Sequence, residues 1–92
     1  MNLNHLRNQI DTLNLQIIAL FAKRAKLSKK IAKIKEKDRL AICDPIREKK
    51  QRSLIKKAAK EQGLDPSLVV EIFELLVTYS KDLQGAKRCT KK

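Results

Sequence analysis

The chain has 92 residues, enough for one small domain at most, and a core of marginal size. It contains two phenylalanines, one tyrosine and no tryptophan, so any core has to be built from Leu, Ile, Val and Ala. Its net charge of +12 predicts attraction to anions, which leaves open nucleic acid, membrane surfaces, acidic metabolites or simply solvated lysine-rich helix faces.

The residues from Asn2 to about Asp38 predict one long helix, capped by Asn2 or Asn4. The stretch holds no Gly or Pro, and its apolar residues recur every three or four positions: Leu3, Leu6, Ile10, Leu13, Ile17, Leu20, Leu27, Ile31 and Ile34. Such a helix would be roughly 55 Å long, whereas a compact chain of this length has a radius of gyration near ~12 Å. The remaining residues are too few to cover it, so we expect an obligate oligomer, most simply a two-fold dimer.

Two Asp-Pro pairs predict the starts of two shorter helices, because aspartate favours the N-cap and proline the first helical position. Asp44-Pro45 opens a helix reaching about residue 62, where Gly63 fits the C′ position. Asp65-Pro66 opens another that reaches about residue 83, before Gly85. No strand pattern competes, so we expect an all-α fold of three helices over residues 1–85, followed by a basic, disordered tail at residues 86–92.

Basic residues interrupt the apolar pattern of the long helix. Arg24 occupies a position in the apolar stripe, where a buried arginine needs an anion or carboxylate, unless it only sets the register of a helix seam. Lys35 follows eleven residues later and returns to within roughly 20° of the same face. Arg7 lies seventeen residues before Arg24, roughly 25 Å along the axis. If Arg7 and Arg24 hold the same small molecule, they come from different chains.

The two shorter helices carry polar residues that also need a reason. Ser80 and Gln84 extend the apolar face of the third helix, where they either find hydrogen-bond partners or ease the helix toward solvent. Arg47 and Glu48 stand in the first turn of the second helix. The helix dipole favours Glu48 there but not Arg47, which indicates either a further use or an ordinary surface ion pair.

In this order, these residues resemble the all-helical chorismate mutases. The resemblance covers about residues 3 to 84 and is carried by the following motifs: Leu6-Arg7-Asn8-Gln9-Ile10-Asp11-Thr12-Leu13, Arg24 within residues 17–34, Lys35, Asp44-Pro45-Ile46-Arg47-Glu48, Gly63-Leu64-Asp65-Pro66, Ile72-Phe73, Ser80 and Gln84. It implies an intertwined homodimer whose first helix spans both halves. It also implies conversion of chorismate into prephenate by a Claisen rearrangement in phenylalanine and tyrosine biosynthesis, with no cofactor and no metal.

The resemblance further implies a role for each matched residue. Arg24 and Arg47 of one chain and Arg7 of the other would bind the two substrate carboxylates, with Ser80 assisting. Lys35 and Gln84 would hydrogen-bond the ether oxygen, on which charge builds as its C–O bond breaks. Glu48 and the backbone at Asp44 would orient the ring hydroxyl.

Two positions depart from the family pattern. Asn14 stands where relatives often have aspartate, which bears on helix packing. Lys81 stands beside the site where some relatives have an apolar residue, which leaves the polarity of the pocket open.

Two alternative functions compete with the mutase. An isochorismate-pyruvate lyase shares the scaffold, although Arg47-Glu48 favours the mutase. A basic helical protein that binds nucleic acid would fit the charge, but the chain lacks an aromatic stacking platform. We therefore expect no nucleic-acid partner.

The remaining expectations concern the cellular context. Cys43 and Cys89 lack the spacing of metal ligands, and His5 offers them no partner, so we expect free thiols in a reducing compartment. No signal-peptide pattern opens the chain, and no run approaches ~18 apolar residues. These features predict a cytoplasmic protein without a membrane partner.

Overall fold

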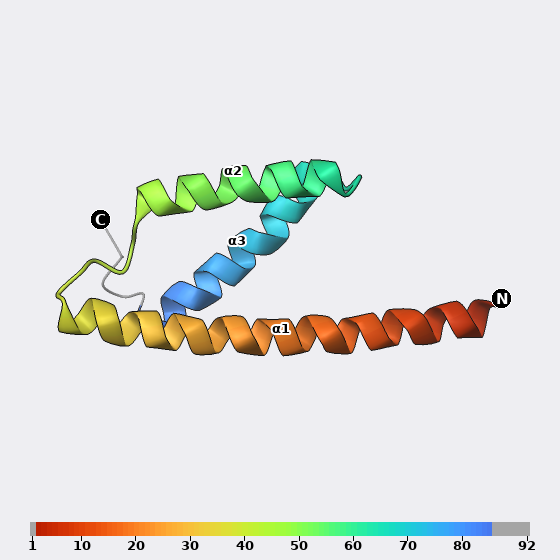
Figure 1. Ribbon diagram of the computed structural model, residues 1–92, viewed down its shortest axis with the longest axis horizontal. Helices are drawn as coiled ribbons and strands as arrows, with labels where there is room; N and C mark the ends of the chain where they lie inside the picture. Colours follow the sequence, from red (N-terminus) through yellow and green to blue (C-terminus); the bar gives the residue numbers. More distant parts are fainter. Residues whose placement is uncertain (1, 86–92) are drawn as a thin grey trace.

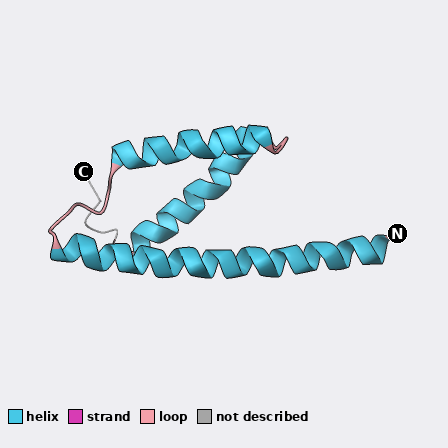
Figure 2. Ribbon diagram, viewed as in Figure 1, coloured by secondary structure: helices cyan, strands magenta, loops and turns pink. Residues whose placement is uncertain are grey.

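The computed structural model describes residues 2–85, and this part is all-helical with no strand (Figure 2). Helix α1 spans Leu3–Lys37, α2 spans Pro45–Glu61 and α3 spans Pro66–Leu83. The three predicted helices and the predicted fold class are therefore confirmed. The predicted tail of residues 86–92 lies outside the described residues.

Local sequence signals set the helix ends. The side chains of Asn2, Asp44 and Asp65 accept a backbone N–H at the starts of α1, α2 and α3. Gly63 and Gly85 follow the ends of α2 and α3 with φ of 72° and 89°, a left-handed conformation that glycine adopts without strain. The predicted N-caps and helix ends are therefore confirmed. They could be predicted because each depends only on neighbouring residues.

The helices form an open arrangement in which α3 runs diagonally between α1 and α2 (Figure 1). The C-terminal part of α3 lies against the C-terminal half of α1, while the N-terminal end of α1 extends beyond the other two helices. The molecule measures 55 × 24 × 22 Å, and its radius of gyration is 16.4 Å, well above the ~12 Å of a compact chain of this length.

Very little apolar surface is buried within one chain. Among residues 2–85, the buried apolar side chains are Ile42 and Ala59, with 5% and 3% of their surface exposed. The nine apolar residues of the predicted α1 stripe keep between 42% and 60% of their surface exposed. The stripe is present, but most of it has no protein covering it in a single chain.

One prediction about the connector between α1 and α2 is wrong. Cys43 is disulfide-bonded and not a free thiol. The other cysteine of the chain, Cys89, lies outside the described residues. Sequence spacing argues against a metal site, but a disulfide depends on the distance between two cysteines in space, which spacing does not give.

Candidate active site

A cavity of about 250 Å³ lies between the C-terminal half of α1, the start of α2 and the C-terminal half of α3. Its lining includes seven of the eight predicted site residues: Arg24, Lys35, Asp44, Arg47, Glu48, Ser80 and Gln84. Leu27, Ile31 and Val77 add apolar surface to the wall. The cavity is therefore small, largely cationic and partly apolar, which suits a compact organic anion.

Arg24 is fixed at the contact between α1 and α3. Its Nη1 donates to the backbone oxygen of Leu76 at 3.0 Å and to the hydroxyl of Ser80. Partial burial lowers the pKa of the Arg24 guanidinium, because desolvation disfavours the charged form. The guanidinium has five N–H donors, and these two bonds leave the donors of its other nitrogens for a ligand.

Ser28 completes this small network. It is buried, with 5% of its surface exposed, and its hydroxyl donates to the Ser80 hydroxyl at 2.8 Å. Ser80 therefore accepts from Arg24 and from Ser28, which leaves its own hydroxyl hydrogen available to a ligand. Ser28 was not predicted as a site residue, although it lies one turn after Arg24 on the same face of α1, and that spacing could have indicated it.

Lys35 is held near the last turn of α1. Its ammonium donates to the backbone oxygen of Ile42 at 2.7 Å, so the side chain bends toward the connector that leads to α2. An ammonium has three N–H donors, and this bond uses one of them. The buried side chain of Ile42 anchors the connector and thereby helps to place Lys35.

The first turn of α2 brings two oppositely charged residues to the cavity. The Asp44 carboxylate accepts the backbone N–H of Arg47 at 3.0 Å, which fixes the start of the helix. Arg47 is exposed, whereas Glu48 is partly buried. The Glu48 carboxylate forms an ion pair with Lys81 of α3, with 2.8 Å between Oε2 and Nζ.

Two predicted site residues remain to be placed. Gln84 is the C-cap of α3, lies partly buried and lines the cavity one turn beyond Ser80. Arg7 does not line it. The helix rise separates Arg7 from Arg24 by roughly 25 Å, so a single chain does not bring the two arginines together.

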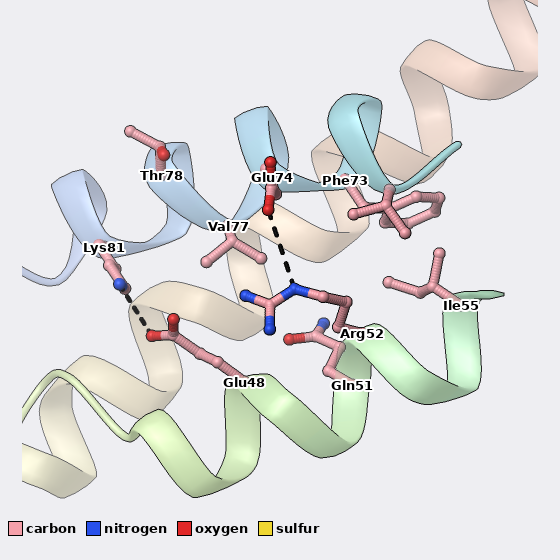
Figure 3. Close-up of a pocket in the computed structure, with 10 residues that line it drawn as sticks. Glu48, Gln51, Arg52, Ile55, Phe73, Glu74, Val77, Thr78 and Lys81 are labelled. Atoms are coloured by element: carbon pink, nitrogen blue, oxygen red, sulfur yellow. Dashed lines mark ion pairs between the residues drawn. The ribbon is translucent and has the colours of Figure 1, made fainter. Parts of the chain in front are cut away.

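A second cavity of about 310 Å³ lies between α2 and α3, and the Glu48–Lys81 pair is part of its lining (Figure 3). Glu48, Gln51, Val77 and Lys81 line both cavities. The wall of the second cavity is mixed, with apolar side chains such as Ile55 and Phe73 beside the charged Arg52 and Glu74. The ion pair thus stands at the boundary between the two.

The part of the chain that the structure describes contains no helix that is both long and apolar enough to cross a membrane.

Comparison with known proteins agrees with the motifs found in the sequence. The family model of chorismate mutase type II matches residues 6–85. A chorismate mutase from Methanocaldococcus jannaschii is 37% identical over 82 residues, which cover 89% of this chain and 83% of that protein. The T-protein of Haemophilus influenzae is 33% identical over 70 residues, 76% of this chain but 19% of that protein. The chain therefore belongs to the chorismate mutase type II family, and its activity is that of a chorismate mutase, an isomerase.

Proposed function

We propose that the cavity binds chorismate and converts it into prephenate without covalent catalysis, as a step in phenylalanine and tyrosine biosynthesis. The observation that carries this proposal is the convergence of Arg24, Lys35 and Arg47 on one cavity of about 250 Å³. Chorismate is a dianion, and guanidinium groups bind carboxylates with matching charge and forked geometry. The reaction is intramolecular, so holding the two reacting ends in a compact conformer already lowers its barrier.

Substrate binding rests on the arginines. Arg24 enters the complex pre-oriented by Leu76 and Ser80, so little side-chain entropy is lost when it binds a carboxylate. The Ser80 hydroxyl adds a neutral donor beside it. Arg47 is exposed at the cavity wall and binds the second carboxylate together with Arg7 of the partner subunit.

The rate acceleration rests on Lys35 and Gln84. Negative charge builds on the ether oxygen as its C–O bond breaks, so donors aimed at that oxygen stabilise the transition state more than the ground state. Lys35 dominates because a charged donor outperforms a neutral one. Its bond to the Ile42 oxygen holds the ammonium in place before the substrate arrives, which supports this role.

Orientation of the ring rests on the start of α2. The Glu48 carboxylate accepts a hydrogen bond from the ring hydroxyl, and the backbone at Asp44 provides a second contact. The capped first turn of α2 supports this assignment, because the Asp44 side chain fixes the backbone that carries both groups.

The complete site needs a second copy of the chain. The exposed stripe on α1 and the 16.4 Å radius of gyration support an intertwined homodimer in which each α1 covers the other. The same arrangement brings the partner's Arg7 to the cavity, which one chain alone does not do. No cofactor or metal is assigned a role in this mechanism.

The test is a spectroscopic assay of purified protein with chorismate, in which the absorbance of the substrate decays faster than in buffer. No acceleration contradicts the proposal. Isochorismate is assayed in parallel, because release of pyruvate from it identifies the lyase on the same scaffold.

The predicted cytoplasmic location also stays a prediction. The disulfide at Cys43 does not support it, because disulfides persist mainly in oxidising compartments. Fractionation of the source cells, followed by immunodetection of the protein, decides the question.

A further inference from the structure

We propose that Lys81 is a positioning residue of this active site and that it acts through Glu48. This inference rests on the role of Glu48 in the proposed function. Its ammonium neutralises the Glu48 carboxylate and holds it in one rotamer at the cavity wall. The dianionic substrate then meets Glu48 as a hydrogen-bond acceptor and not as a like charge.

The contact between the two side chains is close and sheltered. Lys81 Nζ lies 2.8 Å from Glu48 Oε2, and the two side chains keep 28% and 27% of their surface exposed (Figure 3). Shorter distances and less water both strengthen an ion pair relative to an ordinary surface pair. The pair is therefore more than a solvated contact between neighbouring helices.

A second ion pair between α2 and α3 offers a direct comparison. Arg52 Nε lies 3.8 Å from Glu74 Oε2, and these side chains are 44% and 58% exposed. Arg52 and Glu74 line the second cavity only, whereas Glu48 and Lys81 line both cavities. Both pairs join the same two helices, but only the Glu48–Lys81 pair reaches the site.

The charge of the site explains why Glu48 needs a cation. A carboxylate on the wall of a pocket that receives a dianion raises the free energy of the complex through like-charge repulsion. Lys81 offsets that charge from a position on α3, so Arg24, Lys35 and Arg47 remain available for the substrate. A glutamate side chain also has several rotamers, and a fixed partner selects one of them before binding.

Substitution of Lys81 tests the interaction through its effect on KM. Lys81→Met keeps an unbranched side chain only one atom shorter but leaves the Glu48 charge without its partner, so KM for chorismate rises about tenfold and kcat changes less. Lys81→Arg restores the cation and most of the wild-type KM. In a Glu48→Gln background the repulsion is absent, so Lys81→Met changes KM less than twofold.

Arg52→Met is the matched control, because it also removes one positive charge and one α2–α3 ion pair. It leaves KM and kcat within twofold of wild type. A similar rise in KM in Arg52→Met and Lys81→Met would mean that either change acts through helix packing or net charge, and it overturns the proposal. An unchanged KM in Lys81→Met, or a full tenfold effect in the Glu48→Gln background, overturns it as well.

A binding measurement separates this inference from the proposed function. Calorimetric titration with prephenate, the dianionic product, needs no turnover, and it should show about tenfold weaker binding to Lys81→Met but not to the Arg52→Met control. If the wild-type protein lacks mutase activity, the proposed function fails, while this titration, repeated in the Glu48→Gln background, still decides whether Lys81 acts through Glu48. Equal affinity in wild type and Lys81→Met overturns the role of Lys81 alone.

Discussion

At the scale of single residues, we expect substitution of Lys35 to lower kcat more than any other change. Lys35→Ala removes the charged donor to the ether oxygen, so kcat falls on the order of a hundred- to a thousandfold, or about 3–4 kcal/mol. Lys33→Ala is the control, because Lys33 is exposed on α1 and does not line the cavity. Steady-state kinetics with chorismate measures both variants. A decrease in kcat below tenfold for Lys35→Ala contradicts the assigned role.

Ser28 provides a smaller effect of a different kind. Its hydroxyl donates to Ser80, so Ser28→Ala leaves Ser80 with one fewer partner and loosens the support of Arg24. We expect kcat/KM to fall about fivefold, close to the ~1 kcal/mol of one neutral hydrogen bond. Ser53→Ala, an exposed substitution on α2, should leave kcat/KM unchanged. Equal kcat/KM in the two variants would mean that the Ser28–Ser80 bond does not support binding.

The sequence predicted Arg24 but not Ser28 for a physical reason. A charged residue inside an apolar stripe is conspicuous, because burying it without a partner costs several kcal/mol. A serine on a helix is ordinarily exposed to solvent and does not by itself indicate a site. The role of Ser28 becomes visible only in the structure, where α3 places Ser80 against it. The ion pair of Glu48 with Lys81 was missed for the same reason, since it joins two different helices.

At the scale of helices, the start of α2 links stability to catalysis. The Asp44 and Asp65 side chains each accept a backbone N–H at 3.0 Å, so Asp44→Ala and Asp65→Ala should each lower the free energy of unfolding by about 1 kcal/mol. Asp44→Ala should also lower kcat/KM about tenfold, because Arg47 and Glu48 follow in the same turn. Asp65→Ala should leave kcat/KM unchanged, because α3 begins away from the cavity. Thermal unfolding and steady-state kinetics test the two effects separately, and equal losses of activity contradict a special role for the first turn of α2.

Helix boundaries were predictable where the determinants are adjacent in sequence. The Asp-Pro pairs and the glycines at positions 63 and 85 act within one turn, and the structure has them at the predicted helix ends. The disulfide at Cys43 was not predictable from the same kind of reasoning. It depends on the distance between two cysteines in space, which no local pattern encodes.

At the scale of the whole molecule, the length of α1 bears on the oligomeric state of the protein. The helix has 35 residues, and its apolar stripe stays largely exposed in a single chain. Burial of apolar surface is the main favourable term in folding, so we expect a chain with so small a core to gain most of its stability from a partner. The length and periodicity of the sequence lead to the same expectation, and the dimer stays a prediction. The sequence could not predict how two chains would pack against each other, because no residue pattern fixes how two identical stripes align.

The shared site makes a prediction that only a dimer fulfils. Arg7→Ala and Arg24→Ala should each be nearly inactive, because each removes one arginine from both sites of its homodimer. When the two variants are unfolded and refolded together in equal amounts, half of the dimers are mixed, and each mixed dimer has one site with the Arg24 of one chain and the Arg7 of the other. About a quarter of the wild-type kcat per chain should therefore return. Native mass spectrometry of differently tagged chains measures the fraction of mixed dimers. Mixed dimers without recovered activity would contradict a site built from two chains, because intact Arg7 and Arg24 would then not suffice when they meet across the interface.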